Sequence, residues 1–165
     1  MEILDGQIIV SLRIFKGMDL WNDFDMAKIA DRLRYALLTK KISYQRAARE
    51  MGVSRDLVFD YTNPEYSESS MHPEILIKFA DYLGEEKYYF CNEYHIFLEQ
   101  VDAGSLLRKL KKEHKMTRRQ FAVYLGISYE SYRSYESGRN KVPRELFDRL
   151  QKEMEPDGQS QSKSR

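Results

Sequence analysis

The sequence predicts an all-α protein that consists of two small helical units in tandem. Apolar residues recur at helical spacing along most of the 165 residues, and serine, threonine and glycine stand where helices would begin and end. The chain also resembles itself, because a shift of 74 positions places one segment on another. The matched positions are mostly apolar, small or glycine, whereas the charged positions differ. Two copies of one fold with different surfaces are therefore expected.

These observations divide the chain into four segments. We expect an N-terminal arm (1–23), a degenerate first unit (24–100), a second unit (101–154) and a disordered polar tail (155–165). The net charge of +1 conceals an uneven distribution, since the first unit carries 10 basic and 13 acidic side chains and the second carries 13 and 7. A polyanionic partner is therefore expected to bind the second unit.

Two segments have patterns of their own. The arm alternates Ile8, Val10, Leu12 and Ile14, which is typical of a strand that pairs with its copy in a second protomer or folds back over the first unit. An aromatic stretch is expected on the last helix of the first unit, where it would pack the junction between the units. It comprises Tyr88, Tyr89, Phe90, Tyr94 and Phe97.

The second unit is expected to begin and end with an amphipathic helix. Gly104 and Ser105 are expected to cap the first helix, which ends near His114. Pro143 is expected to start the last helix, after a turn at Gly138. Each helix has an apolar stripe, formed by Leu106, Leu107 and Leu110 in one and by Leu146, Phe147 and Leu150 in the other.

Between these helices, two short helices are expected to be joined by a sharp turn. Thr117 is the expected N-cap of a helix over 118–125, and Ser128 is the expected N-cap of the helix after it. Gly126 stands at the turn, where glycine adopts the left-handed conformation without steric cost. Ala122 is small enough to let two helices cross closely.

The ordered motif is more specific than any one of these residues. It is Thr-x4-Ala-x3-Gly-Ile-Ser, an apolar residue four positions after the serine, and then Tyr-Glu-x-Gly-Arg-Asn-x-x-Pro. The motif resembles the Cro/phage-repressor-like (XRE) family of helix-turn-helix regulators, specifically over 106–150 and more weakly over 29–83. This resemblance implies two tandem bundles of four or five helices. In the family the third helix enters the major groove of DNA, and we expect this role to be weakened or lost in the first unit.

The third helix and its flanks carry the candidate DNA-binding residues. Arg133 is suited to bidentate recognition of guanine, and Glu130 to accepting a hydrogen bond from a cytosine amino group. The start of the second helix and the loop after the third are expected to contact phosphates. The full set is Thr117, Arg118, Arg119, Ser128, Tyr129, Glu130, Ser131, Arg133, Ser134, Arg139, Asn140 and Lys141.

Other positions are expected to serve the fold. The resemblance implies an ion pair between Lys111 and Glu136, and the structural set comprises Lys111, Ala122, Gly126 and Glu136. In the first unit the equivalents of that pair are Leu37 and Thr62, so both charges are absent together, which leaves neither charge buried alone. The face equivalent to the third helix has two carboxylates that phosphates would repel. It is expected to bind a second DNA site or a protein partner, and it comprises Tyr44, Arg55, Asp56, Phe59 and Asp60.

The resemblance and the charge distribution together predict a sequence-specific transcriptional regulator that binds double-stranded DNA, most simply a repressor. Relatives usually bind palindromes as dimers, so a homodimer is one expected assembly. The alternative is a protein-interaction module of the antitoxin or phage-encoded-inhibitor type. In that case the acidic first unit binds a protein partner and the second unit autoregulates.

The sequence gives no sign of catalysis or of a membrane. It has no nucleophile elbow, phosphate loop, metal-ligand spacing, signal peptide or membrane-spanning run. Cys91 is the single cysteine, which suits a reducing compartment. We therefore expect a cytoplasmic protein that is not an enzyme and needs no cofactor or metal.

Overall fold

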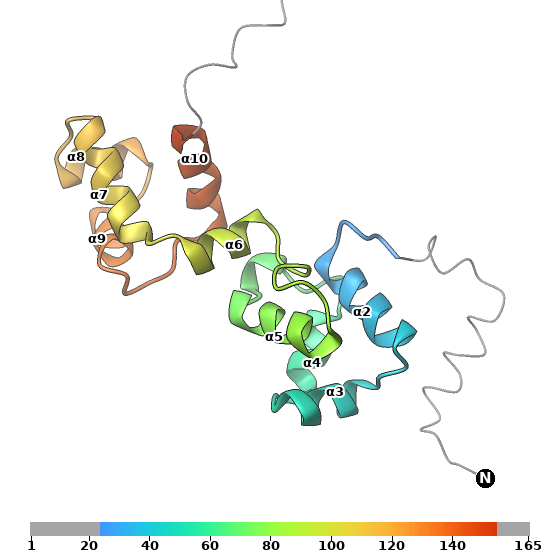
Figure 1. Cartoon of the computed structure of the whole chain (residues 1–165). Helices are drawn as coiled ribbons and strands as arrows, with labels where there is room; N and C mark the ends of the chain where they lie inside the picture. The colour runs from blue at the N-terminus through green and yellow to red at the C-terminus, as the bar shows by residue number, and fades with distance from the viewer. Residues whose placement is uncertain (1–23, 155–165) are drawn as a thin grey trace, which may run out of the picture. The chain divides into compact units, whose positions relative to one another are not determined.

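The computed structural model describes residues 24–154 (Figure 1). The chain forms two compact units, the first ending at Asn92 and the second beginning at Glu93. All regular structure in the described residues is helical, which confirms the predicted fold class. The strand predicted in the arm and the tail at 155–165 lie outside the described residues.

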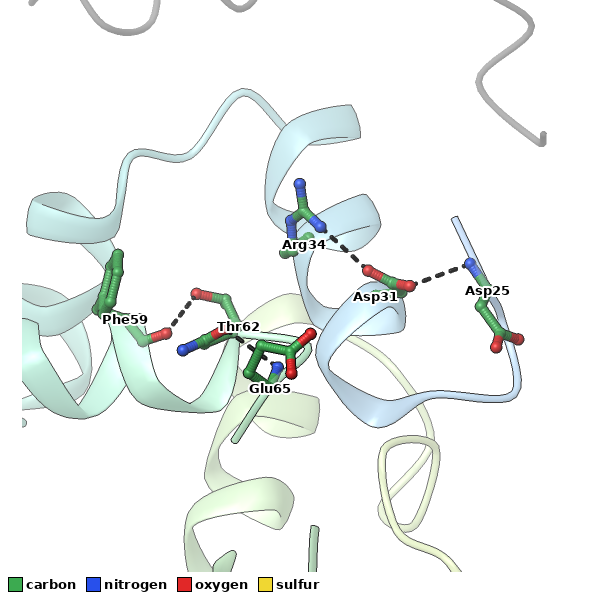
Figure 2. Close-up of polar contacts among 7 residues, drawn as sticks. Asp25, Asp31, Arg34, Phe59, Thr62 and Glu65 are labelled. Carbon is green, nitrogen blue, oxygen red and sulfur yellow. Dashed lines mark hydrogen bonds and ion pairs between the residues drawn. The ribbon is translucent and has the colours of Figure 1, made fainter. Parts of the chain in front are cut away.

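The described part of the first unit, from residue 24, contains four α-helices and one 3-10 helix. They are α2 (Ile29–Thr39), α3 (Tyr44–Met51), α4 (Arg55–Tyr61), the 3-10 helix η2 (Glu68–Ser70) and α5 (Pro73–Leu83). Ser43 and Ser54 cap α3 and α4, because each hydroxyl accepts a hydrogen bond from a backbone N–H in the first turn. In the first turn of α2, the carboxylate of Asp31 accepts from Arg34 and from the backbone N–H of Asp25, which precedes the helix, both at 3.1 Å (Figure 2).

Up to residue 154, where the described residues end, the second unit contains five helices. They are α6 (Glu93–Gln100), α7 (Ala103–Glu113), α8 (Arg118–Tyr124), α9 (Tyr129–Glu136) and α10 (Arg144–Met154). Their inward faces form one core in which Leu107, Phe121 and Tyr132 are fully buried. Burial of these large side chains is the main stabilising term for a unit of this size.

Helix α6 belongs to the second unit, so the predicted boundary at 100/101 is wrong. Tyr94 and Phe97 pack into the second core, where their rings lie 5.5 and 4.9 Å from the ring of Phe147. The Tyr94 hydroxyl also donates to the carbonyl of Val142 at 2.8 Å. These contacts place the last two residues of the aromatic stretch in the second unit, whereas Tyr88, Tyr89 and Phe90 lie in the first.

The N-cap predicted for α7 is also wrong. Asp102 caps this helix, and its carboxylate accepts from the Gly104 backbone N–H at 3.0 Å and from the Ser105 hydroxyl at 2.5 Å. The bond from Ser105 is the largest of the effects that lower the pKa of Asp102. Gly104 lies inside the helix and is buried, so its role is steric rather than capping.

Helix boundaries in the two units follow the 74-residue shift. The helices α2, α3 and α4 begin 74 residues before α7, α8 and α9. The left-handed glycines Gly52 and Gly126 are also 74 residues apart, with φ of +64° and +65°. So are the two described non-glycine residues with positive φ, Lys41 and Lys115. The agreement ends after α4, because a longer loop containing η2 precedes α5.

Candidate nucleic-acid interface

Helices α8 and α9 are fixed at their starts by local hydrogen bonds. The Thr117 hydroxyl accepts from the Gln120 backbone N–H at 3.3 Å, and the Gln120 side chain accepts from the Thr117 backbone N–H at 2.9 Å. This reciprocal pair is a capping box. The Ser128 hydroxyl accepts from the Ser131 backbone N–H at 3.0 Å and starts α9 in the same way.

The turn between α8 and α9 is short and well held. Gly126 adopts φ +65°, and the Ile127 backbone N–H reaches back to the Ala122 carbonyl at 3.0 Å. The guanidinium of Arg149, on α10, donates to the carbonyl of Leu125. The turn is therefore held from the last helix as well as from within, which fixes the angle at which α9 leaves it.

Burial of one face of α9 turns the opposite face outward. Tyr132 is fully buried and its ring meets Phe121 edge-on at 6.0 Å. On the outward side Glu130 and Arg133 are exposed, and Tyr129 is half-buried. We call Tyr129, Glu130 and Arg133 the reading face.

Tyr129 lies between two arginines from different helices. The guanidinium carbon of Arg119, on α8, is 5.4 Å from the centre of the Tyr129 ring, and that of Arg133 is 5.9 Å away. Both distances are within the range of cation–π attraction. Within residues 24–154 neither arginine forms an ion pair with a carboxylate, so two uncompensated positive charges converge on one ring.

The loop after α9 presents a second group of polar side chains. Arg139, Asn140 and Lys141 are all exposed. Gly138 has φ +71°, and the backbone N–H of Arg139 donates to the Ser134 carbonyl at 3.0 Å. The loop is therefore tied back to α9, and its side chains extend from a fixed backbone.

The candidate serines have local roles, of which the sequence pattern reveals only the capping by Ser128. The hydroxyl of Ser134 is buried and has no hydrogen-bond partner within the described residues, so Ser134 does not offer its side chain to the surface. The Ser128 hydroxyl donates to the Ser131 hydroxyl at 2.8 Å while it caps α9. These three residues support the start and end of α9 more directly than they support the reading face.

The carboxylate of Glu136, at the end of α9, interacts with three side chains. Its carboxylate lies 3.8 Å from Lys111 Nζ and 2.8 Å from Arg118 Nε, and it accepts from the Tyr132 hydroxyl at 3.0 Å. The expected pair with Lys111 is thus present, but Arg118 is the closer cation. Burial and the bond to Glu136 raise the pKa of Tyr132. Sequence reasoning missed the role of Arg118, because no local spacing links a residue at the start of α8 to the end of α9.

The corresponding face of the first unit has a different character. On α4, Arg55 and Asp56 are exposed, Asp60 is half-buried, and the Phe59 side chain is 58% exposed. Tyr44, at the start of α3, is half-buried. The structure brings the predicted residues of α4 to one surface but gives that surface little positive charge.

In the first unit, uncharged buried residues take the places of Lys111 and Glu136. Leu37 is in the core, and Thr62 ends α4 with its hydroxyl donating to the carbonyl of Val58 at 2.9 Å. The same hydroxyl donates to the carbonyl of Phe59 at 3.0 Å (Figure 2). Thr62 therefore satisfies its own polar group locally and needs no cation from α2.

Comparison with known proteins agrees with the geometry of the second unit. Residues 107–154 match the family described as Helix-turn-helix, over less than a third of the chain. No curated protein and no solved structure gives a significant match. The matched segment runs from α7 to α10 and contains all the candidate DNA-binding residues of the second unit, which supports a DNA-binding role for this unit.

The described residues include neither a membrane-spanning helix nor a cluster of metal ligands. No helix in residues 24–154 is both long enough and apolar enough to cross a bilayer. Across the same residues, no three His, Cys, Asp or Glu side chains are grouped so that they could hold a metal ion.

Proposed function

We propose that the second unit binds double-stranded DNA with sequence preference and that the chain regulates transcription, most simply as a repressor that occludes a promoter. The observation that carries the proposal is the reading face, where Arg133 stands exposed beside Tyr129 on a helix anchored by Tyr132. A helix of this kind, in a segment that matches the helix-turn-helix family, suits the major groove.

The proposed contacts are of two kinds, those that recognise bases and those that bind phosphates. Arg133 donates two hydrogen bonds to a guanine, and Glu130 accepts from a cytosine amino group. Arg139 and Lys141, in the loop after α9, bind phosphates on the neighbouring strand. Arg118 is held by Glu136, yet its side chain is 55% exposed, so it can contact a phosphate while it stays paired.

The first unit is proposed to be a divergent copy of the same bundle. Its helix starts, serine caps and left-handed glycine follow the 74-residue shift, which supports common ancestry of the two units. One small unit buries too little surface for tight specific binding, so we propose that two chains bind a palindromic site as a homodimer.

Selection from random double-stranded DNA by the full chain tests the proposal. We expect one enriched motif, and Arg133→Ala should relax the preference at one position at a cost of about 1–3 kcal/mol. Arg139→Ala should weaken binding to all DNA sequences about equally. It should also reduce the slope of log affinity against log salt by roughly one, as expected for the loss of one phosphate contact. Failure to enrich any motif, or equal losses on cognate and random DNA for Arg133→Ala, would contradict sequence reading.

A second candidate function is a protein-interaction module in which the second unit serves autoregulation. The large exposed fraction of Phe59 favours it, since nothing in the described fold requires an aromatic ring on that surface.

A further inference from the structure

The first unit has lost the basic side chains that the second unit would use on DNA. The 74-residue shift relates five basic candidates of the second unit to positions that carry no positive charge in the first. Arg118, Arg119 and Arg133 correspond to Tyr44, Gln45 and Phe59 on the matched helices, and Glu65 and Ser67 stand 74 residues before Arg139 and Lys141 in the loop after α4, where the helices no longer match. The absence of positive charge at all five positions should weaken DNA binding strongly, because the affinity for phosphates depends on the number of such charges.

The arginines that remain nearby do not restore a DNA-binding surface. Arg46 Nε lies 2.9 Å from a carboxylate oxygen of Glu50, and Arg49 approaches the same oxygen at 3.9 Å. The Tyr82 hydroxyl also donates to Glu50, at 2.7 Å, and this bond is the largest of the effects that lower the pKa of Glu50. Glu50 thus stays ionised and offsets the two arginines, which leaves Arg55 as the uncompensated cation of α4.

An exposed aromatic ring takes the place of Arg133. Phe59 is 58% exposed, and Asp56 and Asp60 are three residues before it and one after it. Asp56 and Phe59 are three residues apart and Asp56 and Asp60 are four apart, so the two carboxylates neighbour each other on one side of the ring, whereas Arg55, four residues before Phe59, lies on its other side. We call Asp56, Phe59 and Asp60 the Phe59 face; with Arg55 included, this side of α4 carries a net charge of −1. Within the described residues, neither carboxylate forms an ion pair.

The needs of the fold do not explain this combination. Asp60 lies in the last turn of α4, where the helix dipole disfavours a negative charge. Because Phe59 is mostly exposed, its ring adds little to the stability of the fold. A polar side chain at this position would make the surface more soluble. A surface that combines an exposed ring with unpaired carboxylates is complementary to a cationic partner that also has an apolar side chain.

We propose that the Phe59 face is a docking surface for a positively charged segment of another protein, with an apolar side chain of that segment packed against the Phe59 ring. The inference goes beyond DNA binding by the second unit and does not depend on it. The ring would supply most of the affinity, as buried aromatic anchors do in protein interfaces. The two carboxylates would supply selectivity for lysine- and arginine-rich segments and make binding salt-dependent.

The test is selection of random 12-residue peptides displayed on phage against the immobilised full chain. The enriched peptide is then synthesised and its affinity measured for the wild type, for Phe59→Gln and for Asp56→Asn/Asp60→Asn. Val123→Gln is the matched control, because Val123 is an apolar side chain of α8 that is 78% exposed. All these side chains lie at least partly on the surface, and circular dichroism checks that each variant is folded.

We expect peptides that combine Lys or Arg with an aromatic or aliphatic residue. Their affinity should fall at least tenfold for Phe59→Gln and several-fold for the aspartate double variant, and stay within twofold for Val123→Gln. Absence of enrichment over a surface without the chain, or equal binding by Phe59→Gln, would overturn the proposal. So would a selective loss of affinity for the preferred DNA in Phe59→Gln, since that result would assign the face to nucleic acid.

Discussion

Glu136 shows how a single buried carboxylate is stabilised by residues from three helices. Its neighbours are Lys111 on α7, Arg118 on α8 and Tyr132 on α9, so it connects the helices that surround the reading face. Removal of the carboxylate would leave Lys111, which is 23% exposed, and Tyr132 without their partner. An unsatisfied group of this kind costs more than the net gain from the original bond.

The internal repeat suggests a direct test of this cluster. We expect Glu136→Thr to lower the free energy of unfolding by about 1–3 kcal/mol, because it leaves Lys111 without its carboxylate. The double variant Lys111→Leu/Glu136→Thr copies the solution of the first unit, Leu37 and Thr62, and should recover about 1 kcal/mol or more. Urea unfolding of the three chains measures both steps. A double variant that is no more stable than Glu136→Thr would contradict coupling between the two residues.

Tyr129 is expected to position the arginines of the reading face. Replacement by leucine removes the ring that attracts Arg119 and Arg133, at about 0.5–1 kcal/mol for each contact. Affinity for the preferred DNA should then fall about 5- to 30-fold, with little change on scrambled DNA. Tyr129→Phe keeps the ring and should stay within about twofold, as measured by fluorescence anisotropy. Equal losses in both variants would instead indicate that the hydroxyl contacts DNA.

At the scale of the helices, the bounds could be predicted from sequence where they are set by residues within one turn of the chain. Thr117, Gly126 and Ser128 each act within one turn of the chain, so the bounds of α8 and α9 followed closely from the sequence. The N-cap of α7 did not, because aspartate, glycine and serine stand close together there and all are acceptable caps. The domain that contains α6 was mispredicted for another reason. Its aromatic residues mark it as a buried helix but do not specify which core buries it.

Close contact between α7 and α9 depends on Gly104. A methyl group at this position would collide with the backbone carbonyl of Glu136. The equivalent residue of the first unit is Ala30, which is buried, so that unit accommodates the methyl group. The reading face therefore rests on a closer helix crossing than its first-unit equivalent.

We expect Gly104→Ala to lower the free energy of unfolding by about 1–3 kcal/mol, because the collision is with backbone and cannot be relieved by a rotamer change. The same variant should weaken DNA binding, since α9 must shift to admit the methyl group. Gly138→Ala is the control, as its new methyl group meets open space and the cost of about 1 kcal/mol comes from φ +71° alone. Urea unfolding and DNA titration of both variants separate the two effects. Unchanged stability of Gly104→Ala would show that the crossing is looser than described.

For the whole molecule, the division into units determines which part of the chain can be isolated. Cutting at the boundary expected from sequence, before residue 101, would remove α6 and with it Tyr94 and Phe97 from the second core. Each of these rings is at least 95% buried, and loss of one such side chain costs about 3–5 kcal/mol. That is comparable with the total stability of a small domain.

We therefore expect a chain of residues 93–165 to unfold cooperatively and to keep the DNA preference of the full protein, whereas residues 101–165 should be largely unfolded at 25 °C. Circular dichroism during urea titration measures the first difference, and anisotropy with the selected DNA measures the second. Phe97→Ala in the longer fragment is an intermediate case, because it removes one ring but keeps the bond from Tyr94 to Val142. Its unfolding midpoint should lie between those of the two fragments. Equal midpoints for 93–165 and 101–165 would show that α6 adds nothing to the second core, and the unit boundary would then return to residue 101.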